Sequence, residues 1–156
     1  MEQIVQVETS DHFEIASQLL REYEQSLGLN LCFQGFETEL ATLPGKYAPP
    51  RGSLLLAFVG NTPAGIIAMR PIEHRICEMK RLYVRPSARG RNLGRKLIRR
   101  IMSDARDAGY VKMRLDTLTG KMDHAIALYR EFGFYEIPAY FGSPLEHELF
   151  LQADLV

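Results

Sequence analysis

The sequence predicts an α/β fold in which helices flank a mixed central β-sheet, with the elements in the order β-α-α-β-β-β-α-β-α-β-β. Three observations predict it. Several short stretches alternate apolar and polar residues, as strands with one buried face do. Longer stretches repeat apolar residues every three or four positions, as helices on a core do. The chain has 156 residues, the size of one domain with a substantial core, so we expect a single domain over residues 1–156.

The N-terminal part is expected to contain one strand and two helices. Residues 3–7 alternate as a strand does, and Ser10 or Asp11 can cap a helix that ends at Gly28. A loop then leads to a short helix near residues 37–43.

The remaining elements combine strand alternation with two helical stripes, each followed by a glycine where a C-terminal cap belongs. They are expected at residues 53–59 and 64–70 (a hairpin), 75–84 (a long strand), 91–108 (a helix), 111–116 (a strand), 123–132 (a helix), and 135–140 and 147–153 (the closing strands).

The long strand contains a break in its alternation. Cys77 and Met79 share one face, whereas Leu82 and Val84 are out of phase with them by one residue. One extra residue near positions 80–81 would restore the phase, and such an insertion is a β-bulge. The other interpretation is a strand that is buried on both faces.

Charge is balanced overall but not along the chain. Nineteen Lys and Arg residues match nineteen Asp and Glu residues, yet the segment from Arg75 to Arg100 holds ten basic residues and one acid, Glu78. A solvated helix face explains part of this charge, and a nucleic-acid surface is a second interpretation. A small polyphosphate ligand fits best, because the charge is local and is accompanied by glycines.

The composition excludes several classes of protein. The longest apolar runs are far shorter than the ~18 residues that a membrane span needs, and the first residues do not resemble a signal peptide. Cys32 and Cys77 alone cannot form a disulfide framework or a four-ligand zinc site. We therefore expect a cytoplasmic protein with reduced thiols and no metal, which binds neither a membrane nor a nucleic acid.

The turn between the long strand and the next helix has the features of an anion site. The first backbone N–H groups of a helix lack partners within the helix, and the helix dipole adds partial positive charge there. Gly90 and Gly94 let a phosphate approach the backbone, and three arginines supply full charges: Arg89, Arg91 and Arg95. The turn is neither a P-loop nor a dinucleotide-binding fingerprint, because the glycine spacing of both is absent.

Two motifs resemble those of the GCN5-related N-acetyltransferases. Residues 82–97 are similar to the acyl-CoA signature Q/R-x-x-G-x-G/A of that family, with Arg89 in the first position and Gly94 in the last. Asn92 stands where the family has the middle glycine, and asparagine tolerates left-handed backbone better than most residues. Residues 125–134 resemble the second motif, A-x-x-L-Y-x-x-x-G-F, although Met122 stands where the family often has a cofactor-contacting asparagine.

The resemblance implies transfer of an acetyl group from acetyl-CoA to an amine by direct attack in a ternary complex. Tyr129 matches the tyrosine that serves the departing CoA thiolate. Backbone N–H groups around Leu82, Tyr83 and Val84 would face the thioester carbonyl, where negative charge develops. The resemblance also implies that the backbone of one continuous segment binds the pyrophosphate: Arg89, Gly90, Arg91, Asn92, Leu93, Gly94 and Arg95.

Glu78 is the candidate general base, because an attacking amine must first lose a proton. It is the one acid in the basic segment, and histone-type members of the family place a glutamate base at the same distance before the first motif position. Two alternatives stay open. Glu78 pairs with a neighbouring Arg or Lys, or a bound water acts as the base.

The acceptor site is expected where the resemblance puts it, between the first two helices and the last hairpin, at residues 29–36 and 137–144. The second stretch has aromatic and turn residues without a dominant charge, which favours a small pocket with apolar walls. We therefore expect a small-molecule amine, with a protein N-terminus or lysine as the second choice. An acyl-CoA sensor without turnover and a homodimer formed through the final strands are further hypotheses.

Overall fold

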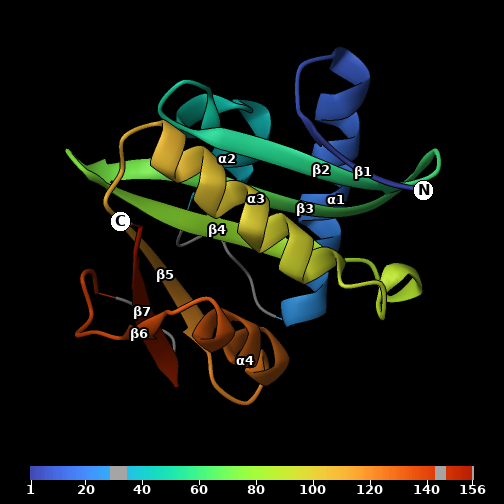
Figure 1. The fold of residues 1–156 in the computed structure, drawn as a ribbon. Coiled ribbons are helices and arrows are strands. Elements are labelled where there is room, and N and C mark those ends of the chain that lie inside the picture. Colours follow the sequence, from blue (N-terminus) through green and yellow to red (C-terminus); the bar gives the residue numbers. More distant parts are fainter. Residues whose placement is uncertain (29–34, 143–146, 156) are drawn as a thin grey trace.

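The structure is a computed structural model, and it describes residues 1–28, 35–142 and 147–155. Its helices and strands follow the expected order, with two short 3₁₀ helices added (Figure 1). The strands are β1 Glu2–Gln6, β2 Ser53–Val59, β3 Thr62–Glu73, β4 Ile76–Val84, β5 Lys112–Leu118, β6 Tyr135–Glu136 and β7 Glu148–Asp154. The helices are α1 Ser10–Leu27, α2 Phe36–Ala41, α3 Leu93–Asp107 and α4 Asp123–Glu131, and the 3₁₀ helices are η2 Gly45–Tyr47 and η3 Pro86–Ala88.

The strands form a seven-stranded mixed sheet in the order β1-β2-β3-β4-β5-β7-β6. All neighbouring strands pair antiparallel except β4 and β5, which pair in parallel. Helix α3 crosses one face of the sheet, α4 lies beside β5 to β7, and α1 and α2 lie behind β2 to β4 (Figure 1). The mixed α/β architecture predicted from the sequence is therefore confirmed.

Two apolar clusters, one on each face, hold these layers together. The first includes Leu97 and Ile101 of α3 with Cys77 and Met79 of β4. The second joins α1 and α2 to the opposite face of β2 and β3, with Leu19 at its centre. Because alternate residues of a strand point to opposite faces, each central strand contributes side chains to both clusters.

The parallel pair of β4 and β5 is short, and this opens the sheet. Three residues of β4, Ile76–Glu78, pair with Lys112–Arg114 of β5. Beyond them the two strands share no further pairs in the described part of the chain, and Figure 1 shows them diverging. The sheet is therefore not hydrogen-bonded between residues 79–84 and residues 115–118, and we call this unpaired stretch the gap.

The β-bulge predicted in β4 is confirmed. Ile66 pairs with Tyr83 and Ala68 pairs with Lys80, so two residues of β4 oppose Ile67 of β3. One of the two is Arg81, whose φ of 65° is the left-handed conformation that such an insertion requires. The bulge restores the phase, because Leu82 and Val84 pack against the same cluster as Cys77 and Met79.

Several predicted boundaries were wrong for local reasons. Thr9 caps α1 in place of Ser10 or Asp11, since its hydroxyl accepts the His12 N–H at 3.1 Å. Helix α3 begins at Leu93, because the left-handed Asn92 cannot continue a helix towards Arg91.

The strands show two further differences. Strand β3 extends over residues 62–73, so the hairpin turn is shorter than expected. The strand expected over residues 135–140 ends at Glu136, and Pro138, which has no N–H for a ladder, follows shortly after. No helix in the described residues combines the length and apolarity needed to cross a bilayer.

Candidate active site

The edge of β4 that faces the gap carries backbone groups unused by the sheet. The Arg85 N–H donates to the Ala64 carbonyl of β3 at 2.8 Å. Because the backbone groups of successive strand residues point to opposite sides, those of Val84 point away from β3. The Val84 carbonyl accepts a hydrogen bond from Arg89 Nε at 3.2 Å, which agrees with this alternation. The N–H of Val84 is therefore directed into the gap. Of the three predicted residues here, Leu82 and Val84 turn their side chains towards α3, whereas Tyr83 faces α1.

The start of α3 lies near the same edge of β4. Asn92 has a φ of 60°, so the left-handed conformation inferred for this position is confirmed. Its side chain does not cap the helix but accepts a hydrogen bond from Arg95 Nη1 at 2.9 Å. The first intrahelical donor is the Lys96 N–H, which bonds to the Asn92 carbonyl at 3.0 Å. The N–H groups of the first turn of α3 thus have no intrahelical acceptor.

Two glycines keep this turn open. Gly90 has a φ of 86°, a conformation that side chains strain, and a Cβ there would meet no atom within 4 Å. Gly94 lies where α3 approaches α4, and a Cβ would lie 3.5 Å from Leu128 Cδ1. At these two positions, therefore, no side chain covers the backbone of the turn.

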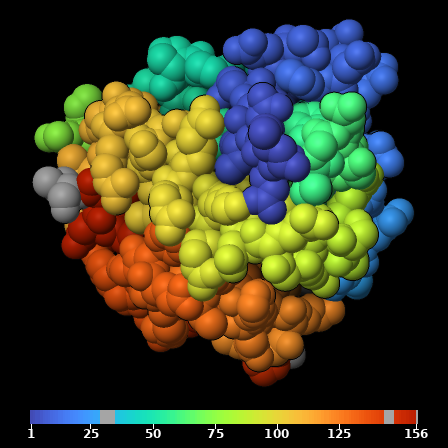
Figure 2. All heavy atoms as spheres, turned by 45° about the vertical axis from the view of Figure 1, so that its right-hand side comes forward, coloured from blue at the N-terminus to red at the C-terminus, as the bar shows by residue number. Residues whose placement is uncertain are grey.

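The arginines of the turn differ in their pairing. Arg89 and Arg91 are exposed, whereas Arg95 Nη2 forms an ion pair with Glu131 of α4 at 2.8 Å. In Figure 2 this segment, in yellow-green, covers the surface between the N-terminal residues in blue and α4 in orange. Lys96 pairs there with Glu2. The positive charge predicted for this segment is therefore partly neutralised, and the exposed arginines carry the rest.

Tyr129 of α4 lies in the core cluster on the α3 side of the sheet, 4% exposed. Its ring packs against Phe134 at 5.7 Å between centroids, and its hydroxyl makes no hydrogen bond to the described residues. Burial, followed by the proximity of Tyr23 and Asp116, raises the pKa of this hydroxyl above its ordinary value. The Tyr129 hydroxyl is thus a neutral donor without an acceptor among residues 1–28, 35–142 and 147–155.

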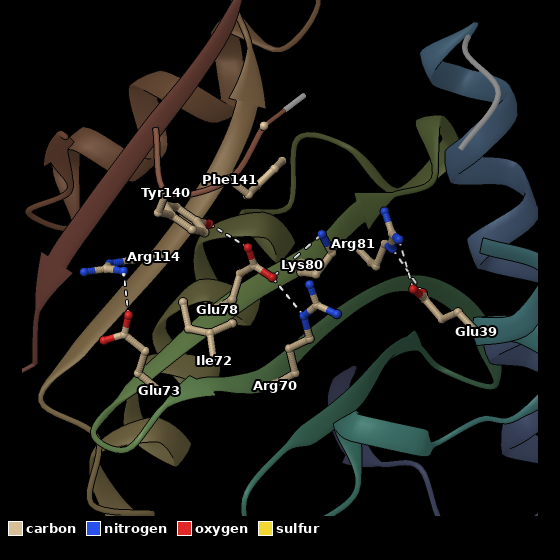
Figure 3. Close-up of a pocket in the computed structure, with 11 residues that line it drawn as sticks. Glu39, Arg70, Ile72, Glu73, Glu78, Lys80, Arg81, Arg114, Tyr140 and Phe141 are labelled. Atoms are coloured by element: carbon tan, nitrogen blue, oxygen red, sulfur yellow. Dashed lines mark hydrogen bonds and ion pairs between the residues drawn. The ribbon is translucent and has the colours of Figure 1, made fainter. Parts of the chain in front are cut away.

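Glu78 occupies the opposite face, because its neighbours Cys77 and Met79 point towards α3. It is 1% exposed, and both of its oxygens accept hydrogen bonds. Arg70 Nε donates to Oε1 at 2.9 Å, and the Tyr140 hydroxyl donates to Oε2 at 2.6 Å (Figure 3). Glu78 therefore contacts the neighbouring cations Arg70 and Lys80. The same carboxylate also lines a cavity, so the pairing does not exclude a role in catalysis.

Lys80 spans the start of the gap. Its ammonium nitrogen lies 3.8 Å from Oε1 of Glu78 on its own strand and 3.9 Å from Oδ1 of Asp116 on β5. Burial lowers the pKa of Lys80, and the two carboxylates oppose that shift. One buried cation thus connects the two strands where they separate.

The cavity beside Glu78 has a volume of about 380 Å³. Tyr140, Phe141 and Gly142 form one wall, so part of the stretch predicted at the acceptor site is present, while residues 143–144 lie outside the described residues (Figure 3). The prediction of apolar walls was wrong. Strand residues supply most of the lining, and seven of the lining residues, including Glu39 of α2, are charged: Glu39, Arg70, Glu73, Glu78, Lys80, Arg81 and Arg114.

The other half of the predicted acceptor site is only partly described. Residues 29–34, with Cys32, lie outside the described residues. Phe36 is fully buried and packs beneath the guanidinium of Arg81, which lies 5.3 Å from its ring centroid. Phe36 therefore packs against the bulge residue Arg81 and does not line the cavity.

The charged cavity residues of β3 to β5 other than Glu78, among them Arg70, Lys80 and Arg114, were not predicted from the sequence. Arg70 could have been placed near Glu78 only with the hairpin register, and that register shifts between Pro71 and Glu73. Tyr140 meets Glu78 from 62 positions away in the chain, which no local pattern records.

The described residues hold no cluster of side chains suited to a metal ion. Cys77 is buried, and burial raises the pKa of its thiol to about 12, so a reactive thiolate is disfavoured at neutral pH.

Known proteins share this arrangement. The model of the acetyltransferase (GNAT) family matches residues 14–134. An uncharacterised N-acetyltransferase of Schizosaccharomyces pombe is 38% identical over 139 residues, which cover 88% of this chain and 85% of that protein. Among solved structures, a GNAT acetyltransferase from Staphylococcus aureus superposes with a TM-score of 0.83 at 17% identity, with full coverage of both chains.

The PaiA N-acetyltransferase of Thermoplasma acidophilum, solved in complex with coenzyme A, superposes with a TM-score of 0.76 at 16% identity, covering 99% of each chain. These two structures establish the likeness of the fold, and the family match and the yeast relative establish kinship in sequence. The divided sheet, the uncapped helix after β4 and the two motifs are thus explained together: the chain belongs to the GNAT family of acetyltransferases.

Proposed function

We propose that the protein transfers an acetyl group from acetyl-CoA to the amine of a small-molecule acceptor, by direct attack in a ternary complex. The observation that carries this proposal is the gap between β4 and β5. It lies between two chemically different environments, the anion-binding turn and Tyr129 on the α3 side and the charged cavity around Glu78 on the other side. A thioester in the gap would meet an acceptor in the cavity.

Acetyl-CoA supplies the activated acetyl group, and the residues of the chain bind and orient it. The pyrophosphate is assigned to the N–H groups at the start of α3, with Arg89 and Arg91 adding charge. The N–H of Val84 faces the position where the thioester oxygen gains negative charge. Backbone donors at this place cost no reorganisation during the reaction, because the bulge already holds them in place.

The proposed chemistry moves one proton from the amine to sulfur. The acceptor nitrogen attacks the carbonyl carbon, a C–N bond forms, and the C–S bond breaks. Glu78 accepts the proton of the amine directly or through a water molecule, in exchange for one of its present hydrogen bonds. Tyr129 donates its proton to the departing thiolate and recovers one from solvent, while Glu78 releases the proton of the amine to solvent. A raised pKa suits this role, because the hydroxyl stays protonated at neutral pH.

The volume of the cavity favours a small acceptor. About 380 Å³ is at the low end for ligand pockets and matches a metabolite better than a folded protein surface. A cytoplasmic location, one domain over residues 1–156 and association of two copies through the last strands stay predictions.

The test is release of CoA thiol from acetyl-CoA with a panel of small amines, a lysine-containing peptide and a peptide with a free N-terminus. We expect steady turnover with at least one small amine and a product that has gained one acetyl group by mass spectrometry. Turnover with the peptides alone would contradict the small-molecule acceptor. Binding of acetyl-CoA without turnover on any amine would identify a sensor and contradict the proposed reaction.

A further inference from the structure

The cations of the cavity around Glu78 are not equally engaged. Arg81 forms a paired interaction with Glu39 through Nε at 3.0 Å and Nη2 at 2.9 Å, and this neutralises both. Lys80 is held between Glu78 and Asp116. The two remaining cations, Arg70 and Arg114, reach the cavity from β3 and β5 and lie on either side of Glu78 (Figure 3).

Arg70 uses only part of its donor capacity. Its Nε bonds to Glu78, while its terminal nitrogens make no hydrogen bond to the described residues. A guanidinium has five N–H donors, so four of those of Arg70 have no acceptor among the described residues and can serve a ligand. The side chain is 33% exposed, which leaves those donors accessible from the cavity.

Arg114 is similarly available. Its Nε donates to Gln152 Oε1 at 2.9 Å, and its guanidinium lies 5.3 Å from the ring centroid of Tyr140. Its Nη1 has a single long ion pair, 3.7 Å from Glu73 Oε1, and that glutamate side chain is 61% exposed. Solvent screens such a pair strongly, so an anion in the cavity can compete for Arg114.

A planar guanidinium binds a carboxylate through two parallel hydrogen bonds, a geometry that an ammonium cannot offer. A ligand that carries only positive charge would offer no acceptor to the free donors of Arg70 and Arg114. Building on the proposed function, we infer that the acceptor is a small amine that carries its own carboxylate, as amino acids do. Arg70 and Arg114 bind the carboxylate, and the amine lies beside Glu78.

This inference is tested by calorimetric titration of the CoA-saturated protein, which needs no turnover. The probes are a panel of L-amino acids, the matching carboxamides and spermidine. We expect at least one amino acid to bind about tenfold or more tightly than its carboxamide, since a hydrogen-bonded charge pair is lost in the amide. Equal or tighter binding of the carboxamides or of spermidine, or no binding of any amino acid, would overturn it.

Substitutions of Arg114 and Arg70 test whether these two residues cause the preference for a carboxylate. Arg114→Gln should reduce the preference for the carboxylate to less than about threefold while the carboxamide binds as before, and Arg114→Lys should restore part of it. Arg130→Gln, an exposed arginine of α4, is the matched control and should leave the preference unchanged. A preference that survives Arg114→Gln and Arg70→Lys alike would overturn the assignment. Thermal unfolding of each variant identifies any that fail to fold.

The two proposals can fail separately. A carboxylate preference in binding without acetylation would support the carboxylate site at Arg70 and Arg114 and contradict the transfer reaction. Acetylation of carboxamides as fast as of amino acids would support acetyl transfer and contradict the inference that the acceptor needs a carboxylate.

Discussion

Glu78 on β4 and Arg114 on β5 are the last residues that face each other across the parallel pair, and both side chains line the cavity. The sheet therefore opens at the very residues that offer a carboxylate and a guanidinium to a ligand. The gap, the bulge at Arg81 and the cavity form one continuous feature, since each lies within a few residues of Glu78 on β4.

The role of Tyr129 can be isolated with Tyr129→Phe, which keeps the packing against Phe134 and removes the unpartnered hydroxyl. We expect kcat to fall by about 10- to 100-fold, because the thiolate then leaves without a proton donor. The KM for acetyl-CoA should change little, and the melting temperature should not fall, since no hydrogen bond is lost. Thiol-release kinetics and thermal unfolding measure these quantities.

Tyr135→Phe is the control for that substitution. The Tyr135 hydroxyl bonds to Asp154 and Gln152 at the far edge of the sheet, so its removal should leave kcat unchanged. If Tyr129→Phe retained wild-type kcat, the assignment of Tyr129 to the leaving group would be wrong.

Glu78→Gln should lower kcat/KM by about 100-fold or more at neutral pH, because glutamine cannot accept the proton of the amine. The loss should shrink as the pH rises, since a growing share of the acceptor is then already deprotonated. The measurement is kcat/KM against pH for both proteins. Glu136→Gln, at an exposed position of β6, should follow the wild-type profile. A loss of the same size at every pH would indicate that Glu78 acts only through its ion pairs.

The ion pairs around α2 should contribute unequally to stability. Arg81 and Glu39 are 3% and 15% exposed, whereas Arg21 and Glu37 are 55% and 61% exposed. Arg81→Met leaves a buried carboxylate unpaired and should lower the free energy of unfolding by about 3 kcal/mol. Arg21→Met should lower it by less than about 0.5 kcal/mol. Urea denaturation compares the two, and equal losses would contradict this account of the bulge.

Glu22 links α1 to the end of β4, where it accepts hydrogen bonds from Arg85 Nε at 3.0 Å and Nη2 at 2.8 Å. The hydrogen bonds from Arg85 lower the pKa of Glu22 below its ordinary value of 4.5. A lowered pKa means that the stabilisation is present above about pH 4.5 and is lost as the pH falls through the folded-state value.

Glu22→Gln should therefore cost about 1 kcal/mol of unfolding free energy at pH 7, and the difference from wild type should be smaller at pH 3. Denaturant titrations at both pH values measure it. A difference in unfolding free energy that grew as the pH fell would contradict a lowered pKa of Glu22.

The order of the elements and the bulge could be predicted because they are recorded in local patterns. The bulge in particular follows from one phase slip between Met79 and Leu82, which burial of a single face cannot tolerate. The left-handed Asn92 was likewise predictable, from a glycine position that the family motif marks.

The chemistry of the cavity could not be predicted in the same way. Arg70 contacts Glu78 because of a register shift in β3, and Tyr140 contacts it because of the path of the chain after Pro138. Neither feature produces a periodic pattern in the sequence. The aromatic residues of the last hairpin favoured an acceptor pocket with apolar walls. The charged lining comes instead from alternate residues of β3, β4 and β5, whose common face becomes known only when the sheet is assembled.

Thermal unfolding with acetyl-CoA, CoA and ATP tests most directly the claim on which the rest depends, that the turn before α3 and the gap bind acyl-CoA. Ligand at about 100 times its dissociation constant should stabilise the protein by ~2.7 kcal/mol, a rise of several degrees in melting temperature. The account predicts this rise with acetyl-CoA and CoA and little change with ATP. An unchanged melting temperature with all three, or an equal rise with ATP, would contradict it.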